Sequence, residues 1–224
     1  MMKEVTALVP MKHHSQRVPG KNYRMLAGKP LYYHILETLS SVAEVKEIVV
    51  DTDSPLIKDG LSSHFPQVRV LDRPPDLQGD DVSMNRIIAH DLSLVSGEYF
   101  LQTHSTNPLL KKQTISRAVG KFFENYPDRD SLFSVTRLYT RLWSDDGQAI
   151  NHDPADLIQT QDLPPVYEEN SCLYLFSREG FSNRQHRIGE SPVLFNIERE
   201  EAWDIDTELD FEIAAYLMGD VSGE

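Results

Sequence analysis

The chain has 224 residues, enough to bury one good-sized core and usually too few for two. Its composition is ordinary for a globular protein, and no apolar run reaches the roughly 20 residues needed to cross a bilayer. The net charge of −13 argues against nucleic acid or an anionic membrane surface as a partner. Cys172 is the single cysteine, which excludes an internal disulfide and a thiolate metal cluster and favours a cytoplasmic location.

Strand-like and helix-like segments alternate through the first two-thirds of the chain. Short β-branched or alternating runs predict strands at residues 5–9, 48–50, 68–71, 99–101 and 132–135. Helices are predicted between them at residues 30–39, 55–63, 83–94 and 113–123, with Pro30 in the first turn of the first helix. This alternation predicts an α/β fold, in which helices sandwich a mostly parallel sheet.

The alternation breaks at residues 136–169, a segment rich in Arg, Asp and Pro. Asp145, Asp146 and Gly147 predict a turn between two short strands. A segment that leaves an α/β core in this way is often a dimerisation arm or a substrate lid. We therefore expect a small protruding insertion and a homodimer. Strands at residues 173–176 and 193–197 and a helix at residues 208–218 complete the predicted single domain of residues 1–224.

Charge is distributed unevenly between the two ends of the chain. Residues 1–36 contain six basic residues and one acid, whereas residues 198–224 contain ten acids and one base. A basic first loop that faces an acidic C-terminal segment would suit a site for phosphate and Mg²⁺. Segments of this length also drift in charge by chance, so this distribution alone does not decide the matter.

The loop after the first predicted strand is the first candidate site, because ligands of open α/β sheets bind beyond the carboxyl ends of strands. Triphosphate recognition needs point charges together with orienting donors. Within residues 9–22 the loop offers three cations and three neutral donors: Lys12, Arg17, Lys21, Ser15, Gln16 and Asn22. The pattern is neither the dinucleotide nor the Walker glycine motif, and a solvated basic loop is the alternative interpretation.

Two carboxylates, Asp204 and Asp206, stand just before the last predicted helix. Residues i and i+2 of an extended segment share a side, so the pair could hold one Mg²⁺ or divide two ions. Helix capping explains the nearby Thr207 and Asp210, but it does not explain Asp204 or Asp206. From its residues alone, this pair is a candidate Mg²⁺ site.

These segments together resemble the CMP-sugar synthetases, the acylneuraminate and Kdo cytidylyltransferases, and most closely the acylneuraminate type. The C-terminal segment resembles the family's D-I-D-T-x-x-D-F/L motif. The N-terminal loop matches the family's P-A-R-G-G-S-K-G-I-P-x-K-N at five positions: Pro10, Ser15, Pro19, Lys21 and Asn22. The resemblance spans nearly the whole chain and implies a Rossmann-like nucleotidyltransferase fold of the GT-A-like kind.

The resemblance also implies roles for individual residues. The nucleotide would be bound by the loop residues Lys12, Ser15, Arg17, Lys21 and Asn22, together with Arg73 and Asp80 of a second loop. Gln102, Asn170 and Tyr174 would contact the sugar acid, although packing explains Tyr174 equally well.

The sequence departs from the family pattern at several positions. His13 and His14 replace two glycines, and they are either donors to phosphate or carboxylate or structural loop residues. An arginine that often binds the sugar carboxylate in this family is absent, since Gln159 and Thr160 occupy its neighbourhood.

The predicted reaction is in-line attack of the anomeric hydroxyl of a 2-keto-3-deoxy sugar acid, of the nonulosonic type, on the α-phosphorus of CTP. Lys12, Lys21 and Asp206 are the predicted catalytic residues, and Mg²⁺ would activate the hydroxyl because no side chain stands out as a dedicated base. Three alternatives stay open. They are an eight-carbon Kdo-type acceptor, a D-x-D glycosyltransferase, and a non-catalytic nucleotide-binding paralogue.

Overall fold

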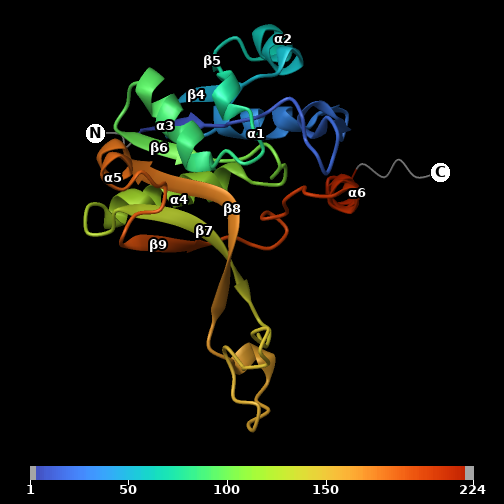
Figure 1. Cartoon of the computed structure of the whole chain (residues 1–224), viewed down its shortest axis with the longest axis vertical. Helices are drawn as coiled ribbons and strands as arrows, with labels where there is room; N and C mark the ends of the chain where they lie inside the picture. The colour runs from blue at the N-terminus through green and yellow to red at the C-terminus, as the bar shows by residue number, and fades with distance from the viewer. Residues whose placement is uncertain (1–3, 220–224) are drawn as a thin grey trace, which may run out of the picture.

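A seven-stranded sheet forms the centre of the computed structural model, which describes residues 4–219 (Figure 1). Its strand order is β5-β4-β1-β6-β8-β7-β9. The strands are β1 (Val5–Leu8), β4 (Val45–Thr52), β5 (Arg69–Asp72), β6 (Tyr99–Gln102), β7 (Ser131–Leu138), β8 (Val166–Ser177) and β9 (Pro192–Asn196). Every pairing is parallel except those of β8 with β6 and β7. The predicted mostly parallel sheet is confirmed.

Helices cover both faces of the sheet. They are α1 (Leu31–Ser40), α2 (Pro55–His64), α3 (Met84–Leu94), α4 (Lys112–Asn125), α5 (Arg178–Arg184) and α6 (Glu208–Leu217). Neighbouring residues of one strand enter different cores, because side chains alternate across a strand. Leu101 packs in the core with α1, α2 and α4, whereas Phe100 packs in the core with α3 and α5. Two covered faces explain why the central strands are apolar at consecutive positions.

Several details differ from the predictions. Pro30 is the N-cap of α1 rather than part of its first turn, and it ends the strand β3 (Lys29–Pro30), which pairs with β2 (Met25–Leu26). This hairpin and the short helix α5 were not predicted. Three 3₁₀ turns complete the structure: η1 (Lys21–Tyr23), η2 (Pro75–Leu77) and η3 (Thr160–Asp162). Within residues 4–219, no helix combines the length and apolar character needed to traverse a membrane.

The predicted insertion is a protruding arm. β7 and β8 continue beyond the sheet as a two-stranded ribbon that extends from the body of the molecule (Figure 1). The predicted turn is present, since Gly147 has a φ of 81° and its N–H donates to the Ser144 carbonyl over 3.0 Å. The two short strands predicted around it are reduced to one bridge, between Trp143 and Ala149.

A small separate core joins the two ends of the chain. Val18 and Leu26, from the N-terminal region, pack with Ile205 of the segment before α6. Phe211 and Ala214, on α6, belong to the same buried cluster. Burial of these apolar groups holds the first loop against the C-terminal segment. This contact brings the two predicted ligand-binding segments together.

Candidate active site

The basic loop and the C-terminal carboxylates face each other. Nη2 of Arg17 donates to Oδ1 of Asp206 over 2.7 Å, and Nζ of Lys21 lies 3.6 Å from the same oxygen. Lys21 also donates to the carbonyl oxygen of Ile205. Burial lowers the pKa of Lys21, and the charges of Asp204 and Asp206 oppose that shift. The basic loop therefore faces the acidic segment, as the charge distribution suggested.

Asn22 holds the basic loop in shape. Its Nδ2 donates to the carbonyl oxygen of Lys12 over 2.8 Å, and its Oδ1 accepts from the hydroxyl of Ser105 over 2.6 Å. Gly20, with a φ of 67°, supplies the left-handed turn that leads into η1. Because Asn22 is buried and both ends of its amide are engaged, it connects the loop to the segment after β6.

Asp80 connects the basic loop to the segment after η2. Its carboxylate pairs with Lys12 and accepts a hydrogen bond from the side chain of Gln16. The contact with Lys12 is the main reason that the pKa of Asp80 is lowered. Asp80 therefore holds the side chains of Lys12 and Gln16 close to each other.

These groups surround a cavity of about 490 Å³, here called the basic-loop pocket. The pocket is large enough for part of a nucleotide, and its walls carry both cations and carboxylates. Eight of the residues predicted from the sequence line it: Lys12, Ser15, Arg17, Lys21, Asn22, Asp80, Asp204 and Asp206. The fold therefore brings together most of the predicted nucleotide and metal residues.

Arg73, predicted to contact the nucleotide, does not line this pocket. Its guanidinium is buried, forms an ion pair with the carboxylate of Asp51 and donates to the Asp51 carbonyl over 3.2 Å. Asp91, on α3, completes this buried group, and burial raises the pKa of Asp91 to about 9. Arg73 neutralises an internal charge, which is a structural role.

Asn170 also lies outside the pocket. Its Oδ1 accepts from the hydroxyl of Ser134 over 2.6 Å, and its Nδ2 donates to the hydroxyl of Thr136 over 3.0 Å. It lines a neighbouring cavity of about 430 Å³, which shares Asp204 and Asp206 with the basic-loop pocket. Asp204 and Asp206 therefore line both cavities.

Gln102 and Tyr174, predicted to contact the sugar acid, are fully buried, and neither lines the basic-loop pocket. Oε1 of Gln102 accepts from Arg187, and its Nε2 donates to the Thr103 carbonyl and lies 3.1 Å from Nε2 of His104. The hydroxyl of Tyr174 is bonded to a carboxylate, and burial raises its pKa to about 12. The residues that reach the pocket surface here are His104 and Arg187.

His104 is a neutral histidine. Burial, followed by the nearby positive charges of Arg187 and Lys21, lowers its pKa to about 3. Since the amide of Gln102 donates toward Nε2, the proton of the ring is assigned to Nδ1.

The donor set of Asp204 and Asp206 fits a hard divalent cation. Oδ1 of Asp204 is buried and has no hydrogen-bond partner, and burial is the main reason that its pKa is raised. A buried carboxylate oxygen without a partner is costly unless a cation or a proton satisfies it. The capping box predicted for the next helix is confirmed, with Thr207 and Asp210 bonded reciprocally.

A comparison with known families decides the assignment. A family model described as cytidylyltransferase matches residues 6–217, almost the whole described chain. The chain belongs to the cytidylyltransferase family.

Individual relatives of the chain are distant. It is 26% identical over 91% of its length to an N-acylneuraminate cytidylyltransferase of Streptococcus agalactiae serotype V, of which it covers 51%. It is 28% identical to the CMP-N,N'-diacetyllegionaminic acid synthase of Legionella pneumophila, with 96% of both chains covered. It spans about half the length of the first of these relatives.

A solved structure confirms the fold of the chain. The CMP:2-keto-3-deoxy-manno-octonic acid synthetase, solved with CTP, superposes with a TM-score of 0.72 at 14% sequence identity. The superposition covers 97% of this chain and 99% of that chain. The predicted Rossmann-like nucleotidyltransferase fold is confirmed.

His13 and His14 of the basic loop have different surroundings. Nδ1 of His13 lies 2.7 Å from the hydroxyl of Ser54, and its ring stacks on Tyr23. His14 lines the basic-loop pocket. The structural interpretation therefore fits His13, whereas His14 is positioned to face a ligand.

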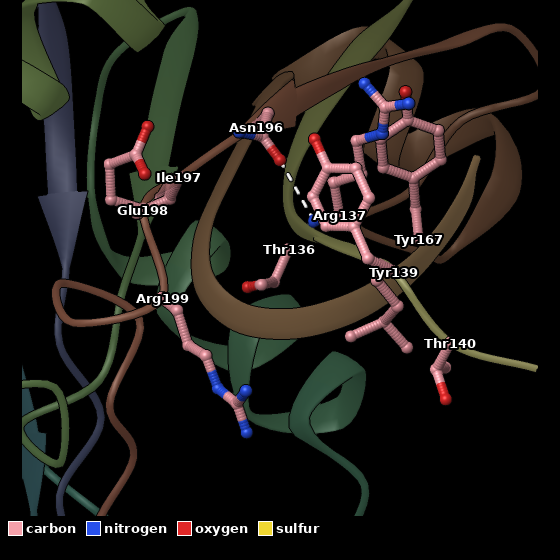
Figure 2. Close-up of a pocket in the computed structure, with 10 residues that line it drawn as sticks. Thr136, Arg137, Tyr139, Thr140, Tyr167, Asn196, Ile197, Glu198 and Arg199 are labelled. Atoms are coloured by element: carbon pink, nitrogen blue, oxygen red, sulfur yellow. Dashed lines mark hydrogen bonds between the residues drawn. The ribbon is translucent and has the colours of Figure 1, made fainter. Parts of the chain in front are cut away.

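A larger cavity, of about 760 Å³, lies at the base of the arm (Figure 2). Figure 2 shows Arg137 on β7, Tyr167 on β8, Tyr139 just after β7, and Arg199 on the segment after β9. The backbone N–H of Arg137 donates to Oδ1 of Asn196 over 3.0 Å. None of the sequence-predicted site residues lines this hollow.

Proposed function

We propose that the protein transfers CMP from CTP to the anomeric hydroxyl of a 2-keto-3-deoxy sugar acid of the nonulosonic type, releasing pyrophosphate. The observation that carries this proposal is the meeting of Arg17 and Lys21 with Asp204 and Asp206 on one pocket. Relatives named as acylneuraminate and legionaminic acid enzymes support the acidic acceptor.

The cations of the basic loop would hold the triphosphate. Lys12, Arg17 and Lys21 all line the pocket, and each one now faces a carboxylate. Phosphate oxygens make charge-assisted hydrogen bonds to such groups. Donors that are already in place stabilise the charge that develops on the departing pyrophosphate without reorganisation.

Asp204 and Asp206 would hold Mg²⁺. The bound ion would neutralise phosphate charge and lower the pKa of the attacking hydroxyl. The chain's own candidate for a general base is weak, since a pKa of about 3 leaves the His104 imidazole little affinity for a proton. His104 is better suited to donate a hydrogen bond from its neutral ring to the acceptor.

A homodimer formed through the arm is part of the proposal. The arm exposes large apolar side chains, including Trp143, Ile150 and Leu157. Apolar groups gathered on a thin ribbon gain free energy when a second copy covers them. We take the second copy of this chain as the occupant because the arm has too little core to bury these groups itself.

The test is to mix the protein with CTP, Mg²⁺ and a panel of sugar acids, and to measure pyrophosphate and the CMP-sugar. The panel contains nine-carbon acids, among them N-acetylneuraminic and legionaminic acid, and the eight-carbon Kdo. Formation of both products with a nine-carbon acid supports the proposal. Transfer of sugar from a preformed nucleotide sugar would instead identify a glycosyltransferase, and binding of CTP without turnover would identify a non-catalytic paralogue.

A further inference from the structure

Arg187 forms no ion pair with any acid among residues 4–219. It lies between α5 and β9, and its guanidinium lines the basic-loop pocket. The guanidinium stacks on Tyr174, with Cζ 3.5 Å from the ring centroid, and Nη1 donates to Oε1 of Gln102 over 2.5 Å. Glu169 acts on Arg187 electrostatically, but its carboxylate is bonded to the hydroxyl of Tyr174 and forms no ion pair with the arginine. The remaining N–H groups of Arg187 have no protein acceptor among residues 4–219.

The loop that carries Arg187 is held in place before any ligand binds. The backbone N–H of Arg187 donates to Oδ1 of Asn85 over 3.2 Å. Two residues on, the N–H of Gly189 donates to the hydroxyl of Ser131 over 2.8 Å. A side chain on an anchored loop, stacked on a buried ring, loses little conformational entropy when it binds a ligand.

Arg187 differs from the basic-loop cations, because it forms no ion pair with the carboxylates that they face. His104 is close to Arg187 through a shared partner: its Nε2 lies 3.1 Å from Nε2 of Gln102, whose Oε1 accepts from Arg187, and the charges of Arg187 and Lys21 both lower the pKa of His104. Arg187, His104 and Lys21 line the same pocket. The pocket therefore carries cations of the basic loop and a further cation, Arg187, together with the neutral imidazole of His104. Such a pocket suits two reactants that each carry negative charge.

We propose that Arg187 binds the carboxylate of the acceptor sugar acid, and that Gln102 and Tyr174 are positioning residues for it. This inference rests on the proposed function, because it takes the triphosphate to be the anion at the basic loop. A planar guanidinium with free N–H groups matches a carboxylate in charge and in shape. It would supply the cation that the neighbourhood of Gln159 and Thr160 lacks.

The experiment compares Arg187→Gln with the unaltered protein in steady-state kinetics and in calorimetric binding of N-acetylneuraminic acid and Kdo in the presence of CMP. Loss of one charge-assisted interaction should raise KM or Kd for the acid about 10–100-fold. KM for CTP should change less than about twofold, since the Arg187 guanidinium contacts Gln102 and Tyr174 and is not bonded to Lys12, Arg17 or Lys21 of the basic loop. The unaltered protein should bind the acid more tightly than its carboxamide analogue, whereas Arg187→Gln should bind the two with similar Kd.

Two further variants separate this role from a structural one. Arg184→Gln removes an exposed arginine of α5 that pairs with Glu190, and it should leave both KM values unchanged. Gln102→Glu should place a carboxylate in an ion pair with Arg187. This ion pair should compete with the acid for the guanidinium and weaken binding of the acid, while KM for CTP stays unchanged. That split is not expected from a general disturbance of the fold.

The outcomes distinguish this inference from the proposed function. Turnover by Arg187→Gln with an unchanged KM for the acid overturns the inference alone. Acid binding that depends on Arg187, without turnover of any acid by the unaltered protein, supports the inference and overturns the proposed function. If the unaltered protein neither binds nor converts any acid of the panel, both are overturned.

Discussion

Arg17 and Asp206 are 189 positions apart in the chain, yet Nη2 of the arginine donates to Oδ1 of the aspartate over 2.7 Å. The contact exists because the first loop and the segment before α6 share one small apolar core. In the free protein the aspartate is held by cations that we assign to the triphosphate. When CTP and Mg²⁺ bind, the cations would contact the phosphates and the aspartate would bind the ion.

Replacement of Asp206 by alanine should abolish pyrophosphate release from CTP and the acceptor acid while the fold is kept. The side chain contacts the basic loop at the surface rather than filling a core, so its removal costs little stability. Pyrophosphate assays and thermal unfolding check both parts. Glu212→Ala, which removes an exposed acid of α6, is the matched control and should keep full activity. Normal turnover by Asp206→Ala would refute the metal assignment.

Lys21 should matter more for CTP than Arg17. The side chain of Lys21 is 11% exposed and that of Arg17 is 65% exposed, so water screens the arginine much more strongly. Lys21→Met should lower kcat/KM for CTP about 10–100-fold, whereas Arg17→Ala should lower it less than about tenfold. Steady-state kinetics with varied CTP measure both values, and the opposite order would contradict the assigned geometry.

Thr207→Ala should destabilise the protein by about 1 kcal/mol, because it removes the hydroxyl of the capping box at α6. Thr207→Ser keeps that hydroxyl and should be close to the unaltered protein. Urea denaturation of the three proteins gives the free energies of unfolding. Equal stability of the alanine and serine variants would show that the cap contributes nothing in solution.

The buried group around Asp91 should make stability depend on pH. Burial, together with the charge of Asp51, raises the pKa of Asp91 from 3.8 to about 9, so the folded state retains a proton that the unfolded state releases between these values. Stability should therefore fall as pH rises through this window. Asp91→Asn keeps a neutral donor and should flatten the decline.

Denaturation at pH 5, 7 and 8.5 measures this effect as the difference between the variant and the unaltered protein. The control is Asp59→Asn, which changes an exposed acid on α2. A pH dependence that is identical in Asp91→Asn and the unaltered protein would show that Asp91 is ionised in the folded state.

Polar substitutions on the arm should convert a dimer to a monomer. Leu157 is 80% exposed and Trp143 is 53% exposed, so changing both to serine removes apolar surface without opening a core. Tyr216→Ser, on α6, removes a side chain that is 70% exposed outside the arm and should leave the dimer intact. Sedimentation velocity reports the masses. A dimer that survives the arm substitutions would place the interface elsewhere.

Much of the fold could be predicted from hydrophobic pattern alone, because both faces of the central strands are buried. Leu101 and Phe100 enter different cores, and this is what makes their strand apolar at consecutive positions. The helix α5 was missed because it has seven residues and buries only Phe181. The antiparallel direction of β8 was also not predicted from the sequence, because it depends on the path of the arm that connects β7 to β8.

The charged half of the site could be predicted because its residues stand in two dense clusters, around Lys21 and Asp206. The other half could not. Gln102 was predicted as a site residue, but the sequence does not show that its amide oxygen accepts a hydrogen bond from Arg187. Arg187 stands in a polar stretch with no motif, and only the tertiary contacts reveal that it reaches the pocket.

The most direct test of the account is the stoichiometry of products from CTP, Mg²⁺ and a nine-carbon sugar acid, measured by mass spectrometry together with a pyrophosphate assay. The account predicts one CMP-sugar and one pyrophosphate for each CTP consumed, and no product when the acid is replaced by a neutral sugar. Consumption of CTP without a CMP-sugar, or equal transfer to a neutral sugar, would contradict it.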